Sequence, residues 1–201
     1  MANKRIPFEP DKMYHVYNQG NGGESIFRSD ENYYYFLKKY AQYIYPIAET
    51  FAYCLMPNHF HLLIRIRSAE ELLKLVKNPV GFENLPGFIS RQFSHFFNAY
   101  AKAFNAQYHR KGSLFRGDVN RKLVSQESYY TKLIAYIHLN PVRHGFVEQP
   151  ADWSHTSYHS FLVSKPTLLQ RQEVLDWFGG QEVYLSFHQK PPDSSIAHLN
   201  L

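Results

Sequence analysis

Two histidines, His59 and His61, flank a phenylalanine in a stretch where apolar residues alternate. On a β-strand, residues at this spacing point to the same face, so both imidazole rings can reach one cation. With 11 histidines in 201 residues, chance alone yields roughly 0.6 such pairs, and the spacing by itself is weak evidence. Two half-exposed strand histidines with ordinary hydrogen bonds remain the alternative interpretation.

A second pair, Tyr136 and Asn140, stands at i and i+4 in a helix that the apolar spacing predicts over residues 126–140. Both side chains would lie on the flank of the apolar stripe, where they can reach past the core edge. The asparagine could offer its carbonyl oxygen as a third metal ligand, and the tyrosine could present its hydroxyl to a phosphate. About one such pair is also expected by chance, so a core-edge tyrosine and a helix-ending asparagine explain the spacing as well.

Together, these four residues are a sufficient set for phosphodiester chemistry. A phosphodiester resists attack because its oxygens are negative, and a divalent metal neutralises and polarises one of them. A tyrosine oxygen can then displace the 3′-side oxygen and form a covalent intermediate. Such an intermediate stores the energy of the broken bond, so the DNA can be rejoined without ATP.

A basic segment follows in the chain, between His109 and Val124. It holds five cations against one acid, Asp118, and places an aromatic side chain beside the charge. Positive side chains position phosphates, and aromatic rings stack on unpaired bases. The segment therefore predicts DNA contacts, while a charged, solvated strand edge is the alternative. The predicted DNA-binding residues are Arg110, Lys111, Arg116, Arg121 and Lys122.

The composition is that of a globular chain, with 44% hydrophobic residues, a formal net charge of +5 and one cysteine, Cys54. A single cysteine excludes a disulfide framework and a cysteine zinc site, and its place in a hydrophobic strand predicts a buried thiol. The positive charge suits a nucleic-acid partner but is shared by many other proteins. Since neither a signal peptide nor a membrane-length apolar run is found, we expect a cytoplasmic protein without membrane contact.

The elements expected around these residues alternate as β-α-β-β-α-β, followed by a further helix. This order predicts an α+β fold of the ferredoxin-like, split β-α-β type, with helices on one face of an antiparallel sheet. The other face would then be open and free to hold the histidines. Residues 151–201 are expected to form a C-terminal extension with two short helices. The predicted strands are 13–18, 47–55, 58–66 and about 113–124, and the helices are 29–44, about 87–107 and 126–140.

Several motifs, taken in order along residues 13–162, resemble one protein family. Met56-Pro57-Asn58-His59-Phe60-His61 is similar to the histidine–hydrophobic–histidine signature of HUH single-tyrosine transposases. The segment from Tyr136 to Arg143 resembles the nucleophile helix of one branch, the REP-associated tyrosine transposases. Supporting matches are Tyr14-His15-Val16, Ile26-Phe27-Arg28, Gly112 to Gly117, and Trp153-Ser154 to Tyr158.

The resemblance implies a role for each candidate residue. Residues 1–150 would be the catalytic domain, with His59 and His61 as metal ligands, Asn140 as the third ligand and Tyr136 as the nucleophile. The implied reaction cuts and rejoins single-stranded DNA near hairpins through a 5′-phosphotyrosine link, with Mg or Mn as the cofactor. Two imidazoles suit Mg poorly, but phosphate and water oxygens can complete its coordination shell.

Other interpretations of the sequence stay open. A non-catalytic regulator that binds DNA hairpins could keep the fold and the site, and an RNA-binding module of the same fold would need aromatic residues where His59 and His61 stand. The wider superfamily forms dimers, so a homodimer and a monomer are both open. The segment 68–87 looks longer than is usual in the family. The DNA sequence recognised is not encoded in any motif.

Overall fold

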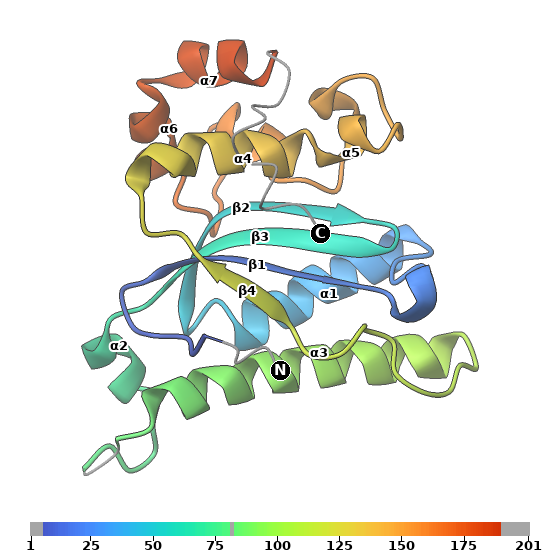
Figure 1. Ribbon diagram of the computed structural model, residues 1–201, viewed down its shortest axis with the longest axis vertical. Helices are drawn as coiled ribbons and strands as arrows, with labels where there is room; N and C mark the ends of the chain where they lie inside the picture. Colours follow the sequence, from blue (N-terminus) through green and yellow to red (C-terminus); the bar gives the residue numbers. More distant parts are fainter. Residues whose placement is uncertain (1–5, 81–82, 190–201) are drawn as a thin grey trace.

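The structure, a computed structural model, describes residues 6–80 and 83–189 (Figure 1). Four strands form one antiparallel sheet in the order β2-β3-β1-β4, and α1 and α3 make the two crossovers. This is the split β-α-β arrangement, so the predicted α+β, ferredoxin-like fold is confirmed. The strands are β1 (Met13–Gln19), β2 (Ala48–Met56), β3 (His59–Ile66) and β4 (Asn120–Leu123).

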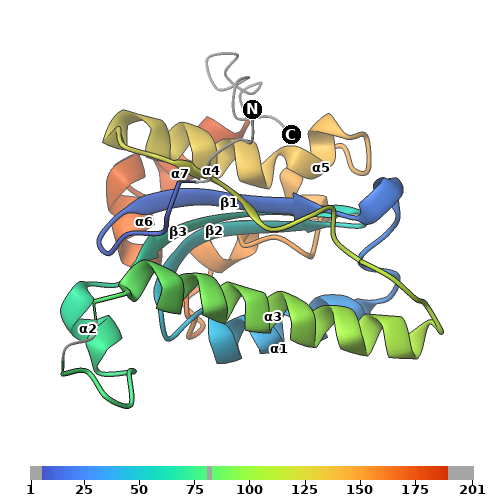
Figure 2. The ribbon, with the colours of Figure 1, turned by 60° about the horizontal axis from the view of Figure 1, so that its bottom comes forward.

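The helices cover both faces of the sheet. Figures 1 and 2 show α1 and α3 on one side, and α4 with the helices that follow it on the other. Within the described residues, no helix combines the length and the apolar character needed to cross a membrane. The helices are α1 (Asp30–Tyr43), α2 (Ala69–Leu73), α3 (Leu85–Gln107), α4 (Tyr130–His138), α5 (Asn140–Arg143), α6 (Arg171–Phe178) and α7 (Gln181–His188).

The core between the sheet and the helices α1 and α3 follows directly from the sequence periodicity. Alternate residues of β3 point into it, as the two-residue period of a strand requires. They meet an apolar stripe of α3 whose residues recur with helical spacing. The β3 residues are Phe60, Leu62, Ile64 and Ile66, and the α3 residues are Ile89, Phe93, Phe96, Tyr100 and Phe104.

The second face of the sheet, which was expected to be open, is covered by α4. Phe51, Cys54 and Leu63 of the sheet form a second core with Leu133 and Ile137 of α4. These sheet residues are apolar, so leaving them in water would cost the transfer free energy of each side chain. The predicted buried thiol of Cys54 is confirmed. The histidine end of β3 is therefore not on an open face but beside the point where α4 ends.

The helix α7 is joined to α4 by a buried chain of hydrogen bonds. His188 donates from Nδ1 to the Tyr184 carbonyl oxygen, 2.8 Å away, so its Nε2 must accept from His138 Nδ1, 2.9 Å away. His138 Nε2 then accepts from the Ser157 hydroxyl at 2.7 Å. This chain of donors works only while both imidazoles are neutral. Burial accordingly lowers the pKa of His188 to about 4 and that of His138 well below its ordinary value.

Acid should therefore weaken the fold before its carboxylates titrate. The unfolded chain takes up a proton at these histidines near pH 6.5 while the folded chain resists it, so stability is complete above about pH 6.5 and falls as the pH drops towards 4. One such histidine contributes a slope of up to about 1.4 kcal/mol per pH unit. Urea denaturation at several pH values should show a shallower slope for His188→Gln. An identical slope in the variant would exclude His188 as a source of the acid sensitivity.

Candidate active site

A cavity of about 370 Å³ lies where the second face of the sheet meets the junction of α4 and α5. All four residues singled out for chemistry in the sequence line it. They come from two separate parts of the chain, β3 and the segment from α4 to α5. The full lining is Gln19, Asn58, His59, His61, Tyr136, Asn140, Arg143 and His144.

The strand β3 sets the positions of the two histidines. His59 pairs with Met56 of β2, and His61 pairs with Cys54, so both side chains leave the sheet on the same face. Their ring centroids are 5.3 Å apart with the ring planes nearly perpendicular. His59 is 5% exposed and His61 1% exposed. The alternative of two half-exposed strand histidines does not describe this arrangement, since both rings are buried.

Two amide oxygens surround the His59 ring. Its Nδ1 is 2.8 Å from Asn58 Oδ1, and its Nε2 is 2.9 Å from Asn140 Oδ1. Burial lowers the pKa of His59 to about 4, with the Asn140 hydrogen bond acting in the opposite direction. The neutral ring has only one N–H, so it can donate to only one of these two oxygens. The other nitrogen presents a lone pair beside an amide group, a donor set that suits a cation.

His61 forms a hydrogen bond with His15, a residue of β1. His15 Nε2 lies 2.9 Å from His61 Nδ1, and both rings are fully buried. Burial lowers the pKa of both histidines, to about 3 for His15. Among the described residues, His15 Nδ1 is the single buried side-chain nitrogen or oxygen atom without a hydrogen-bond partner. A buried polar atom without a hydrogen bond destabilises the folded state, so the pair of His15 and His61 lowers the stability of this fold.

Tyr136 lies on α4 with its ring against both His61 and Arg143. The ring centroids of Tyr136 and His61 are 5.5 Å apart, and the Arg143 guanidinium carbon is 4.8 Å from the Tyr136 centroid. Burial raises the pKa of Tyr136, while the charge of Arg143 and a hydrogen bond with Asn140 lower it. The hydroxyl is therefore protonated near neutral pH, and Arg143 and Asn140 are the two groups that favour its anion.

Sequence patterns missed several members of this site, among them His15, Arg143 and His144. Arg143 stands seven residues after Tyr136, a spacing that places two residues on one face of a helix. That spacing could have identified Arg143, although the helix is interrupted at Leu139, between α4 and α5. His15 could not have been found in this way, because only the pairing of β1 with β3 brings it beside His61.

The five predicted DNA-binding residues differ in their surroundings. The Arg110 guanidinium forms an ion pair with Glu24 and also donates to Asn105 Oδ1 and to carbonyl oxygens of its own loop. Arg121 donates to the Ile6 carbonyl and lies 4.2 Å from the centroid of Phe8. Burial lowers the pKa of Lys122. Lys111 and Arg116 are exposed and are the better placed of the five to meet a phosphate.

The donor set of the cavity limits the metal that it fits. Within residues 6–80 and 83–189, no three or more histidine, cysteine, aspartate or glutamate side chains group as a metal site would require. The cavity instead offers the imidazoles of His59 and His61 together with the Asn140 amide oxygen, and His144 also lines it. This mixed set suits a first-row divalent ion with open positions for oxygen ligands.

The fold and the cavity together define a ferredoxin-like α+β protein with a histidine and tyrosine site at the end of its sheet. No family model matches the chain. A REP-associated tyrosine transposase of Haemophilus influenzae is 28% identical to it over 117 residues, which are 57% of this chain and 61% of that relative. A solved REP-associated tyrosine transposase bound to a REP hairpin shares 17% identity and a TM-score of 0.58, covering 83% of this chain and 89% of its own.

These similarities bear on the family resemblance inferred from the motifs. The curated relative supports it in sequence, and the solved structure supports it in fold, so the resemblance to REP-associated tyrosine transposases is confirmed. The match spans less than two thirds of the curated relative's length, 61%.

Proposed function

We propose that this protein is a transposase-like enzyme that cuts and rejoins single-stranded DNA through a covalent link to Tyr136. One observation carries the proposal: a tyrosine, two histidines and an asparagine from distant parts of the chain line one cavity. Each of the two pairs is expected by chance in the sequence, but chance gives no reason for both pairs to meet in space. The same cavity adds Arg143, a cation suited to a phosphate.

The metal would be held by His59, His61 and Asn140. His59 Nε2 and Asn140 Oδ1 are 2.9 Å apart, so these two donor atoms are already neighbours in the cavity. His15 can accept the Nδ1 proton of His61, which leaves the Nε2 lone pair of His61 free to coordinate. When bound, Mg or Mn would neutralise a phosphate oxygen and polarise the phosphorus.

In the proposed reaction, the Tyr136 oxygen attacks phosphorus and the bond from phosphorus to the 3′-side oxygen breaks. The products are a 5′-phosphotyrosine and a strand with a free 3′-hydroxyl, which can later reverse the step on the same or another strand. Arg143 would stabilise the phenolate as the tyrosine loses its proton, and the leaving oxygen takes up a proton in exchange. The number of phosphodiester bonds is conserved, so no nucleotide cofactor is required.

Hairpin DNA is the substrate class that we propose. The solved relative is bound to a REP hairpin, and this chain has a net charge of +5, which favours a polyanion. A hairpin with a single-stranded flank would bring unpaired phosphodiesters to the cavity.

The proposal is tested by incubating the protein with hairpin oligonucleotides that carry single-stranded flanks of random sequence, in the presence of Mn. A strand labelled at its 3′ end should become attached to the protein in a denaturing gel, and a strand labelled at its 5′ end should be released with a free 3′-hydroxyl. Peptide mapping should locate the attached nucleotide on Tyr136. Tight binding without any adduct would instead favour the non-catalytic hairpin-binding regulator.

Neutralising the two exposed cations of the basic segment should weaken DNA binding in a salt-dependent way. For Lys111→Gln with Arg116→Gln, we expect the slope of log affinity against log salt to become shallower by about 1.4, because each phosphate contact to single-stranded DNA contributes about 0.7. Arg110→Gln is the matched comparison, since its charge is already paired with Glu24. That variant should lower stability by about 1–3 kcal/mol and leave the slope unchanged. Equal slopes in all proteins would exclude Lys111 and Arg116 as phosphate contacts.

A further inference from the structure

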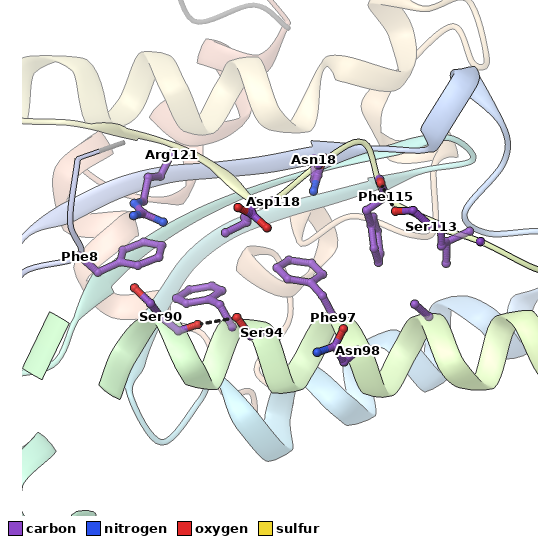
Figure 3. Close-up of a pocket in the computed structure, with 16 residues that line it drawn as sticks. Phe8, Asn18, Ser90, Ser94, Phe97, Asn98, Ser113, Phe115, Asp118 and Arg121 are labelled. Carbon is purple, nitrogen blue, oxygen red and sulfur yellow. Dashed lines mark hydrogen bonds between the residues drawn. The ribbon is translucent and has the colours of Figure 1, made fainter. Parts of the chain in front are cut away.

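A second, larger cavity of about 670 Å³ lies on the other face of the sheet, between α3 and the segment 112–119 (Figure 3). Its walls are aromatic, and its rim on α3 is polar. Phe97 and Phe115 meet edge to face, with ring centroids 5.1 Å apart and planes inclined by 70°. Ser94 and Asn98 line the rim and are exposed. A cavity of this kind favours a flat ligand with polar edges over an aliphatic chain.

One buried polar group points into this cavity. Asn18 is 1% exposed, and its Oδ1 accepts a hydrogen bond from the backbone N–H of Gln19 at 2.8 Å. That bond fixes the orientation of the amide, so the other terminal atom must be the NH₂ group. Figure 3 shows this nitrogen directed toward the cavity. Within the described residues no hydrogen bond from this nitrogen to a protein atom is found. It is also not one of the fully buried atoms that lack a partner, so it is accessible from the cavity and available to an acceptor on a ligand.

The cavity is also close in the chain to the proposed active site. Asn18 and Gln19 are successive residues of β1, and Gln19 lines the cavity that holds Tyr136. Successive side chains of a strand point to opposite faces, so the two cavities lie back to back across the end of β1. One DNA strand that passes around this end of the sheet can therefore contact both cavities with nearby nucleotides.

We infer that the cavity between α3 and the segment 112–119 binds an unpaired base of the DNA strand, stacked on Phe97 or Phe115 and accepting a hydrogen bond from Asn18. The inference rests on the proposed function, because that function supplies the DNA. Stacking tolerates any base. The Asn18 amide adds a preference for a base that presents a carbonyl oxygen at its edge, such as thymine or guanine.

Photochemical crosslinking tests this inference. The probe is a 15-nucleotide oligo(dT) with 5-iododeoxyuridine at successive positions, which crosslinks to aromatic side chains that stack on it. Peptide mapping should find the crosslink on Phe97 or Phe115. Crosslinks confined to residues outside this cavity would overturn the inference.

Two variants and one control make the test specific. Ser94→Trp fills the cavity from an exposed position of α3. We expect the oligonucleotide to bind about tenfold more weakly, because the variant loses the stacking energy of one base. His95→Trp places the same side chain on the next residue of α3, outside the cavity lining, and should bind as the original protein does. Asn18→Asp keeps the acceptor for the Gln19 N–H but removes the donor, and should also weaken binding. Unchanged affinity in Ser94→Trp would refute the site even if Asn18→Asp fails to fold.

Two further measurements distinguish the base-binding site from a site for free nucleotides and from the proposed strand transfer. Thymidine monophosphate should not compete with the oligonucleotide at equal nucleotide concentration, and equal competition would make the cavity a site for free nucleotides instead. The Tyr136 adduct is measured on the same variants. An intact adduct with no crosslink in the cavity refutes the base site alone, whereas a crosslink without any adduct refutes strand transfer alone.

Discussion

Replacing Tyr136 with phenylalanine should abolish the covalent protein–DNA adduct while the protein still folds and binds hairpin DNA. The variant lacks only the hydroxyl oxygen, so no atom remains at that position to form the bond to phosphorus. Its ring can keep the contacts with His61 and Arg143. We therefore expect a loss of stability of about 1 kcal/mol, the net contribution of one hydrogen bond. The measurement is the adduct band in a denaturing gel, together with binding by filter retention.

The matched control for this variant is Tyr129→Phe. Tyr129 lies one helical repeat of seven residues earlier and packs at the edge of the second core, but it does not line the cavity. Its variant should form adduct at the original rate. If the adduct persisted in Tyr136→Phe and vanished in Tyr129→Phe, the nucleophile would be the other tyrosine and the proposed geometry would be wrong.

Removing the imidazole of His61 should have the second largest effect. For His61→Ala we expect at least a thousandfold slower cleavage and a weaker affinity for Mn, with hairpin binding changed by less than about threefold. The reason is that a metal ligand acts on the reacting phosphate, whereas DNA affinity comes from charges spread over the surface. The variant also leaves a cavity and an unpaired His15, which together should lower stability by about 2–4 kcal/mol. The assays therefore belong well below the melting temperature of the variant.

A surface histidine serves as the control for the metal. His95 is an exposed residue of α3, and His95→Ala should keep both cleavage and Mn binding, which electron paramagnetic resonance of Mn can measure directly. Cleavage retained by His61→Ala at saturating Mn would remove His61 from the set of ligands. Lost cleavage with unchanged Mn affinity would leave His61 a role in the reaction other than coordination.

The sheet and the core between it and the helices α1 and α3 could be predicted from the sequence, because both depend on local residue patterns. The alternation of β3 and the helical stripe of α3 each depend on neighbours within a few residues, and both are observed. The last strand was predicted about three times too long. Residues 112–119 meet the end of β1 only at an isolated bridge between Phe115 and Gly20. They do not continue the ladder, because Gly112 and Gly117 adopt positive φ and Leu114 and Phe115 turn into the α3 core.

The helix that carries Tyr136 shows a different limit of sequence patterns. One continuous helix was predicted over 126–140, but the chain forms a 3-10 turn, then α4 and then α5. Pro141 causes the break at Leu139, since it lacks an N–H and its ring clashes with the carbonyl four residues earlier. Tyr136 and Asn140 still share one surface, as predicted, because α4 and α5 both face the same cavity.

Contacts between distant residues were beyond the reach of local patterns. The basic segment was treated as one surface, yet Arg110 is engaged by Glu24, which lies 86 residues away. The covering of the second sheet face by α4, and the support of α4 by α7, likewise depend on tertiary packing. Apolar periodicity indicates that a helix has a buried face but does not say which partner covers it.

The cavity around Tyr136 draws on segments that are far apart along the polypeptide. His15 meets His61 across 46 residues, and His59 meets Asn140 across 81. During synthesis the ribosome must therefore release the chain beyond Arg143 before the reactive centre can assemble, and closing such long loops is slow. A nascent or truncated polypeptide would hold folded pieces of this protein without the assembled cavity, so the proposed DNA cleavage would require the complete arrangement.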